Sequence, residues 1–337
     1  MIHINLRKVL TRAALITGLA FVASCGDDPV DPGPGPGDAD GLQVYYLEFS
    51  AFGNGAVHRV SANGGSSTRL ATTGVAPDGI SVDEDGGKIY WSNMGSGLGT
   101  GGGTLQKANL NGSGVQTLVG TGQGTQTPKQ IQIDEKARYV YWCDREGASL
   151  FRASMDRAND VQVMVSRNNT ANKDGSDTVR FGQLVGLVLD HTRNKIYFTD
   201  RNTGRIHSMG MDIPAGKTAS NRDDVQTLVN QRTISGHNPI DLALDEASGT
   251  LYWTDRNNGR VYRGPLNNLG AYETLVTGLD EPIGIDLDVA NGHMYFSELG
   301  NPVTSSGGSV IRANLDGSRR STIVSGPSIT GLALGFF

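Results

Sequence analysis

Short runs of alternating hydrophobic and polar residues recur along most of the chain, and turns rich in Gly, Asn and Asp separate them. The segment LYWTDRNNGRVYR (residues 251–263) shows the pattern: a run that ends in Thr and Asp, a polar turn, and a second run. Alternation with a period of two is typical of β-strands, and short polar turns between such runs are typical of antiparallel hairpins. The pattern therefore predicts an all-β protein of many short strands.

The first run of this segment, LYWTD, has six copies along the chain. The copies are VYYLE (44–48), IYWSN (89–93), VYWCD (140–144), IYFTD (196–200), LYWTD (251–255) and MYFSE (294–298). We expect the shared aromatic residues to pack between neighbouring repeats. The tyrosines are Tyr45, Tyr90, Tyr141, Tyr197, Tyr252 and Tyr295. They lie 43 to 56 residues apart, which is close to the length of a propeller blade.

A second column of residues supports the repeat. An aspartate ends the run that precedes each tyrosine from Tyr90 onwards, always seven residues earlier: Asp83, Asp134, Asp190, Asp245 and Asp288. A constant offset in a repeat of variable length predicts a tight, invariant hairpin. Two further runs follow, for example VYRGPLNNL (261–269) and YETLV (272–276). Each unit therefore has four strands, and six such units arranged radially bury their faces as a six-bladed β-propeller.

The two ends of the repeat region predict how the ring closes. The region opens at LQVYYLEF (42–49), which corresponds to the second strand of a unit. A run that matches a first strand stands at the C-terminus as SITGLALGFF (328–337). We therefore expect a first blade of four antiparallel strands that is completed by the C-terminal strand.

These motifs resemble the YWTD repeat, the class B repeat of the low-density lipoprotein receptor family. The resemblance covers residues 42–337 and implies a six-bladed propeller; two copies, YFTD and YWTD, keep the aromatic-Thr-Asp signature. Cys143 replaces the threonine in a third copy, and we expect it to be buried. Asn93, Glu48 and Glu298 replace the aspartate in the others. Disulfide-rich receptor modules are absent from this sequence, so the resemblance does not imply receptor biology.

The N-terminal segment has the features of an export signal. A basic stretch precedes a short apolar run in residues 1–24, and the run ends in Val22-Ala23-Ser24-Cys25, which resembles a bacterial lipobox. We expect lipidation of Cys25 and a Pro/Gly/Asp-rich tether over residues 25–41. Asp27 and Asp28 also resemble the export signal of surface lipoproteins. We therefore predict an outer-membrane lipoprotein. The prediction leaves open whether the protein faces the cell surface or the periplasm.

Composition and charge narrow the function classes. The chain has 337 residues, 47 of them glycine, and 19% charged residues, which suits strands and turns rather than helices. Removal of Arg7, Lys8 and Arg12 with the signal leaves 26 basic against 34 acidic residues, a net charge of −8. A nucleic-acid-binding protein usually carries a basic patch, so we expect no nucleic-acid partner.

Loops of variable length predict where a ligand binds. In an antiparallel meander the loops from strand two to strand three, and those between blades, emerge on one face, here called the loop face. Long loops on a rigid scaffold often carry function. This face is predicted to carry a cationic rim for carboxylates, sulfates or acidic sugars. The rim residues are Arg145, Arg201, Arg256, Arg232 and His237.

A structural interpretation of the same residues stays open. Arg145, Arg201 and Arg256 each follow a motif aspartate, so they could instead form Asp–Arg pairs between blades. We expect the aspartates themselves to be structural and to accept hydrogen bonds from nearby turns. These aspartates are Asp144, Asp200 and Asp255.

An enzyme is the competing class. PDGISVDEDGG (77–87) looks like one piece of the metal site of lactonase and gluconolactonase propellers, which lies at the mouth of the channel. Under that alternative, Ca²⁺ or Zn²⁺ would be held by Asp78, Asp241 and Asp286; otherwise no cofactor is expected. The histidines are scattered and no G-x-S-x-G motif is present, which argues against a nucleophilic triad.

The favoured interpretation is a lipid-anchored propeller that binds a protein or a glycan at the bacterial cell envelope. The alternative is a metal-dependent hydrolase of the lactonase type. A structural subunit of an envelope complex also stays open.

Overall fold

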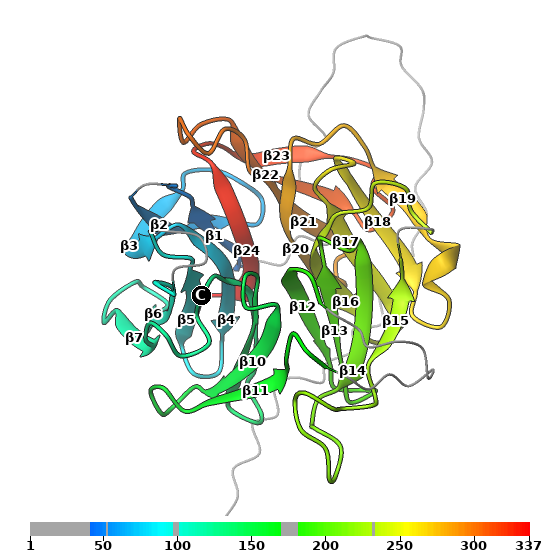
Figure 1. Ribbon diagram of the computed structural model, residues 1–337. Helices are drawn as coiled ribbons and strands as arrows, with labels where there is room; N and C mark the ends of the chain where they lie inside the picture. Colours follow the sequence, from blue (N-terminus) through cyan, green and yellow to red (C-terminus); the bar gives the residue numbers. More distant parts are fainter. Residues whose placement is uncertain (1–40, 52, 97–100, 170–180, 231–232) are drawn as a thin grey trace, which may run out of the picture. The chain divides into compact units, whose positions relative to one another are not determined.

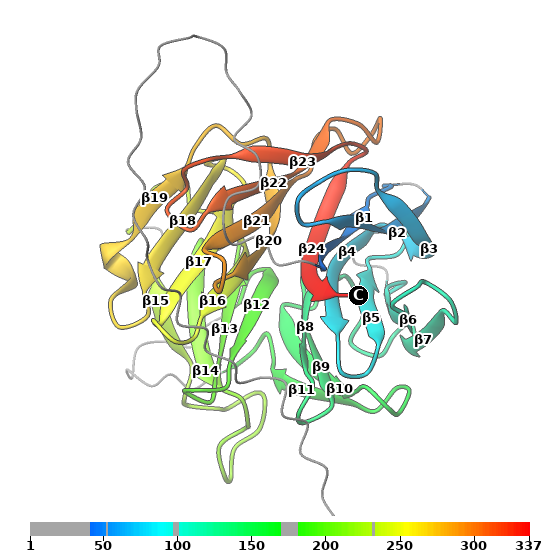
Figure 2. The ribbon, with the colours of Figure 1, turned by 180° about the vertical axis from the view of Figure 1, so that it is seen from behind.

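The architecture is a ring of six four-stranded antiparallel sheets (Figures 1 and 2), as the repeat predicts. The computed structural model describes residues 41–51, 53–96, 101–169, 181–230 and 233–337. The innermost strands of neighbouring sheets contact one another and close a ring around a central channel. Within these residues no helix is long and apolar enough to cross a membrane.

The strands of each blade are given from the innermost outwards. Blade 1 has β24 (Ile329–Phe336), β1 (Leu42–Glu48), β2 (Asn54–Ser61) and β3 (Thr68–Val75). Blade 2 has β4 (Pro77–Asp83), β5 (Lys88–Asn93), β6 (Thr104–Asn109) and β7 (Gln116–Val119). Blade 3 has β8 (Pro128–Asp134), β9 (Tyr139–Asp144), β10 (Ser149–Ser154) and β11 (Val161–Val165).

The remaining blades follow the same order. Blade 4 has β12 (Leu184–Asp190), β13 (Lys195–Asp200), β14 (Arg205–Gly210) and β15 (Gln226–Val229). Blade 5 has β16 (Pro239–Asp245), β17 (Thr250–Asp255), β18 (Arg260–Pro265) and β19 (Glu273–Val276), with a short 3₁₀ helix, η1 (Leu269–Ala271), before β19. Blade 6 has β20 (Pro282–Asp288), β21 (His293–Glu298), β22 (Gly308–Asn314) and β23 (Ser321–Gly326).

The C-terminal strand completes blade 1, which confirms the predicted closure. The red strand β24 pairs antiparallel with the blue strand β1 (Figure 1), with Leu42 opposite Phe336 and Tyr46 opposite Leu332. β24 also contacts β4 and β20, the innermost strands of the blades on either side. One strand from the end of the chain therefore holds blades 6, 1 and 2 together.

The constant offset between aspartate and tyrosine has a local cause. Each strand-one aspartate caps the turn of its own hairpin through backbone amides: Asp83 Oδ1 accepts from the Gly86 N–H at 2.7 Å, and Asp134 Oδ1 from the Ala137 N–H at 2.8 Å. Asp190 Oδ1 accepts in the same way from the Arg193 N–H at 2.9 Å. A side chain that bonds to its own turn fixes the length of that turn.

The six motif tyrosines join neighbouring blades. Each lies in a different hydrophobic cluster, together with core residues of the next blade. Tyr90 of blade 2, for example, packs with Val140 and Trp142 of blade 3, and all three are at most 1% exposed. The core of the propeller is thus a series of interfaces between blades.

Hydroxyl groups of the residues at the Thr position of the YWTD motif connect the innermost strands of neighbouring blades. Thr199 Oγ1 accepts a 2.8 Å hydrogen bond from the Gly186 N–H of its own blade and donates at 3.0 Å to the Ile240 carbonyl of the next blade. Ser92, Thr254 and Ser297 make the equivalent pair of bonds at their own junctions. At Cys143 only a 3.4 Å contact from Sγ to the Gly186 carbonyl is seen, and this cysteine is fully buried and unpaired.

The innermost strands approach so closely that most of them need glycine at one position. A Cβ at Gly186 would lie 2.0 Å from the carbonyl oxygen of Ile240, and one at Gly331 would lie 2.4 Å from the carbonyl oxygen of Asp78. Real side chains cannot occupy that space, so glycine is required at such positions. A cavity lies at each end of the ring of innermost strands.

Candidate functional site

Six equivalent backbone positions form the mouth of the channel on the loop face. Each lies directly after a motif strand, and its N–H donates to a carbonyl just before the innermost strand of the same blade, at 2.8 to 3.2 Å in all six blades. The repeat therefore fixes where these residues stand, whatever their side chains are. The six residues are Phe49, Met94, Arg145, Arg201, Arg256 and Leu299.

All six residues line one cavity of about 400 Å³. The arginines come from the consecutive blades 3, 4 and 5, and the apolar residues come from the consecutive blades 6, 1 and 2. The structure thus brings three of the predicted rim residues together. We predicted the arginines from the sequence but missed Phe49, Met94 and Leu299, although these three residues occupy the same position of the repeat.

A second ring of residues forms the floor of this cavity at the start of the innermost strands. Lys129 donates to Asp78 Oδ1, and the Gln130 side chain donates to Asp78 Oδ2 at 3.2 Å. Burial lowers the pKa of Lys129 to about 8, although the neighbouring Asp78 carboxylate favours its charged form. Val185 and Ile240 form the floor on the side of the arginines.

Two of the three rim arginines have a carboxylate partner. Arg145 Nε lies 2.7 Å from Glu146 Oε1, and Arg256 Nη2 lies 2.6 Å from Glu281 Oε2. Arg201 has no ion-pair partner among the residues that the structure describes. Burial, and then repulsion from Arg256 and Arg145, lowers the pKa of Arg201. Within the described part of the chain, the cavity therefore contains a half-buried guanidinium without an ion-pair partner.

The interpretation of the arginines as Asp–Arg pairs between blades is wrong, because the motif aspartates bind backbone amides instead. Asp144 accepts from the N–H groups of Thr127 at 2.9 Å and Gly147 at 2.7 Å. Asp200 accepts from those of Gly182 at 2.7 Å and Gln183 at 2.9 Å.

Asp255 has the same structural role in blade 5. It accepts from the N–H groups of Asn238 at 3.2 Å and Asn258 at 3.1 Å. All three motif aspartates are thus occupied by the loops of their own blades, as expected of structural residues, and the arginines that follow them remain available to the cavity.

The two other predicted rim residues do not join the site. His237 is 2% exposed and lies inside blade 5, where its Nε2 accepts from the Trp253 indole at 3.0 Å and its Nδ1 donates to the Gly204 carbonyl at 3.0 Å. Burial lowers its pKa, which disfavours the charged form. Its prediction as a rim cation is wrong. Arg232 lies outside the described residues.

The three carboxylates that the enzyme alternative requires do not converge. Asp78 lines the loop-face cavity and pairs with Lys129, whereas Asp286 lines the opposite mouth, on the face of the strand-one hairpins. Asp241 is buried between them; it accepts from the Ile285 N–H at 3.2 Å, and burial raises its pKa well above the usual value. The described part of the chain has no group of three or more His, Cys, Asp or Glu residues placed to hold a metal ion.

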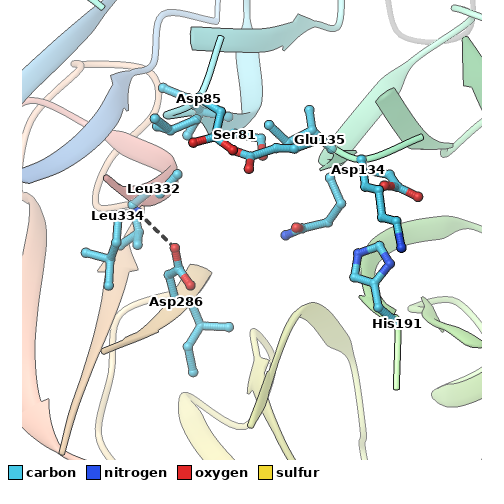
Figure 3. Close-up of a pocket in the computed structure, with 15 residues that line it drawn as sticks. Ser81, Asp85, Asp134, Glu135, His191, Asp286, Leu332 and Leu334 are labelled. Atoms are coloured by element: carbon cyan, nitrogen blue, oxygen red, sulfur yellow. Dashed lines mark hydrogen bonds between the residues drawn. The ribbon is translucent and has the colours of Figure 1, made fainter. Parts of the chain in front are cut away.

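The opposite mouth holds a larger cavity, of about 770 Å³ (Figure 3). Three carboxylates of its lining are engaged within the fold: Asp286 Oδ2 accepts from the Leu334 N–H at 2.8 Å, and Glu135 Oε1 from the Glu84 N–H at 3.1 Å. Asp134 caps its own hairpin. Burial raises the pKa of Asp286 to about 6. These three carboxylates of the hairpin-face mouth thus serve the fold.

The fold and the repeated motif define a six-bladed propeller of the YWTD type. A low-density lipoprotein receptor-related protein 1 of Pyricularia oryzae is 35% identical over 261 residues, which cover 71% of this chain and 81% of that protein. The chain therefore belongs to the family of that protein. No protein-family model matches it. It spans about half or less of the length of the other curated relatives.

Solved structures share the fold at low sequence identity. A chain from the crystal structure of a nidogen–laminin complex superposes with a TM-score of 0.66 and 18% identity, over 87% of this chain and 98% of that one. A putative 6-phosphogluconolactonase of Bacteroides fragilis superposes with a TM-score of 0.53 and 13% identity, over 86% and 82%. At these identities the similarity concerns the fold alone, so it does not separate binding proteins from enzymes.

Proposed function

We propose that the chain is a binding module that engages a protein or a glycan at the bacterial cell envelope through the loop-face cavity. One observation carries the proposal: Arg145, Arg201 and Arg256 line a single cavity, and Arg201 forms no ion pair among the described residues. A partly buried guanidinium binds carboxylate or sulfate groups with two parallel hydrogen bonds. A propeller of the same fold occurs in the nidogen–laminin complex, so the fold is compatible with a protein as the partner.

The proposal includes the site of action. A lipid on Cys25 would hold the protein at the membrane, and the acidic tether over residues 25–41 would keep the propeller away from the bilayer surface. Cys25→Ser is expected to abolish labelling by a radioactive fatty acid and to release the protein from the membrane fraction. Unchanged labelling of that variant would contradict the anchor.

The binding role is tested with the double variant Arg201→Ala plus Arg256→Ala. Purified wild-type protein is cross-linked to envelope extract, the captured component is identified by mass spectrometry, and its affinity for both forms is then measured. We expect the double variant to bind about tenfold more weakly or worse, since charge-assisted hydrogen bonds are lost, while its melting temperature is unchanged. Equal binding by the two forms would contradict the proposed role of the cavity.

A matched control separates charge from position. Arg320 is exposed in the turn before β23, and no ion pair of this residue is seen within the described chain. Arg320→Ala removes one positive charge, as each rim substitution does. Because Arg320 does not line the cavity, this variant is expected to leave partner binding unchanged. If it weakened binding as much as the rim variants do, net charge rather than the cavity would explain the effect.

A further inference from the structure

The loop-face cavity has two chemically different halves. Blades 3 to 5 contribute guanidinium groups, whereas blades 6, 1 and 2 contribute Leu299, Phe49 and Met94. The apolar half is continuous with a buried cluster in which these three side chains pack with Ala76, Val185, Ile240 and Ile283. A ligand that fills the cavity therefore meets cations on one side and hydrocarbon on the other.

The charges of the described residues at the cavity favour a ligand with a single negative charge. Four cations of the described chain line the cavity: Lys129, Arg145, Arg201 and Arg256. Three of them contact a carboxylate: Lys129 contacts Asp78, Arg145 contacts Glu146, and Arg256 contacts Glu281. Among the described residues, one cation is left without an ion-pair partner, and it is Arg201 of the middle blade. A ligand with one negative charge balances the site, whereas a dianion would place its second charge beside residues that are already paired.

We propose that the loop-face cavity binds an organic monocarboxylate, with its carboxylate at Arg201 and its apolar body against Phe49, Met94 and Leu299. The inference rests on the proposed function, since it assigns a ligand class to the same cavity. The volume of about 400 Å³ falls within the range of small-molecule sites. The planar guanidinium of Arg201 matches a carboxylate, and the apolar wall removes hydrocarbon from water. The acid is either a free small molecule or the terminal residue of a peptide.

The experiment is a calorimetric titration of the full chain with octanoate and three matched probes. Octanol has the same hydrocarbon without the charge, acetate has the charge without the hydrocarbon, and suberate is a dicarboxylate of the same length. We expect octanoate to bind and each of the others to bind about tenfold more weakly or worse, because each loses one of the two contacts or adds an unbalanced charge. Equal binding of octanoate and octanol would overturn the role of Arg201.

Variants on the two halves of the cavity locate the ligand. Arg201→Ala is expected to weaken octanoate binding about tenfold or more without changing octanol binding. Leu299→Ala is expected to weaken both, since it removes apolar contact. Arg320→Ala is the control and is expected to change neither. If octanoate bound Arg201→Ala as tightly as the wild type, the proposal would be overturned even with a folded variant.

A second probe distinguishes the two sources of the acid. A tripeptide that ends in a leucine carboxylate is compared with its amidated form and with octanoate. Tighter binding of the free-carboxylate peptide than of octanoate assigns the site to a peptide terminus, and the reverse order assigns it to a free acid. Failure of both to bind overturns the proposal.

The outcome is separable from that of the proposed function. If the rim variants lose the envelope partner but octanoate does not bind, the binding module stands and the ligand class is wrong. If octanoate binds but does not compete with any envelope component, the ligand class stands and the envelope role is wrong.

Discussion

The two mouths of the channel are built by the same repeat, yet they use it differently. On the hairpin face, the residue that follows the strand-one aspartate repeatedly bonds to the neighbouring blade: Glu84 accepts from the Phe336 N–H at 2.9 Å, and Glu246 from the Thr192 N–H at 3.0 Å. On the loop face, six backbone bonds are identical, but the side chains divide into arginines and apolar residues. Repeated side chains thus stabilise the ring, whereas divergent side chains on a repeated backbone form a site.

The largest effect is expected from removal of the C-terminal strand. Deletion of residues 328–337 takes the innermost strand from blade 1 and leaves the faces of β1 and β4 uncovered. We expect the cooperative thermal transition to disappear and the protein to become sensitive to proteases. A protease-resistant protein with an unshifted melt would contradict the closure of the ring by β24.

The next effect is expected at a hydroxyl that joins two blades. Thr199→Val keeps the shape of the side chain but leaves the Gly186 N–H and the Ile240 carbonyl buried without this partner. We expect a loss of about 2 to 4 kcal/mol in the free energy of unfolding, measured by urea denaturation. Thr68→Val, at an exposed position of β3, is the control and is expected to change little. Similar losses for the two variants would argue against the hydroxyl bridge.

A smaller effect is expected from the carboxylate at the hairpin-face mouth. The folded-state pKa of Asp286, about 6, lies above the unfolded value of about 3.9. The proton on Asp286 therefore stabilises the fold below about pH 4, and this contribution is lost as the pH rises through 6. Asp286→Asn is expected to flatten the dependence of the unfolding free energy on pH between 4 and 6. An unchanged slope would contradict the burial assigned to this carboxylate.

The sequence predicted most of the fold because the structural contacts repeat. The aspartate and tyrosine columns, spaced seven residues apart, determine a hairpin that recurs with each blade, and Ser328–Phe337 matches the strand that blade 1 lacks. The bridging role of Thr199 was missed, because a hydroxyl in a strand could equally be exposed. Its neighbours in the next blade become visible only in three dimensions.

The site was harder to predict because it depends on which blades are neighbours and on burial. Arg145, Arg201 and Arg256 were found because they share one column, and that column also contains the apolar half of the cavity. His237 was placed wrongly, since a polar loop gave no sign that its side chain turns inward to Trp253. Arg256 pairs with Glu281, which lies 25 residues away in the sequence, so this pairing could not be predicted from local sequence; Arg201 forms no ion pair within the described part of the chain.

The most direct test of this contrast is the melting temperature of the triple variant Arg145→Ala, Arg201→Ala and Arg256→Ala, measured beside Thr199→Val. The carboxylate partners Glu146 and Glu281 are 23% and 37% exposed, so water reaches them when the arginines are removed, and loss of the three guanidinium groups relieves their mutual repulsion. The melting temperature of the triple variant is therefore expected to stay within about 2 °C of the wild type. A fall as large as that of Thr199→Val would show that the arginines stabilise the ring, and would contradict their assignment to a binding site.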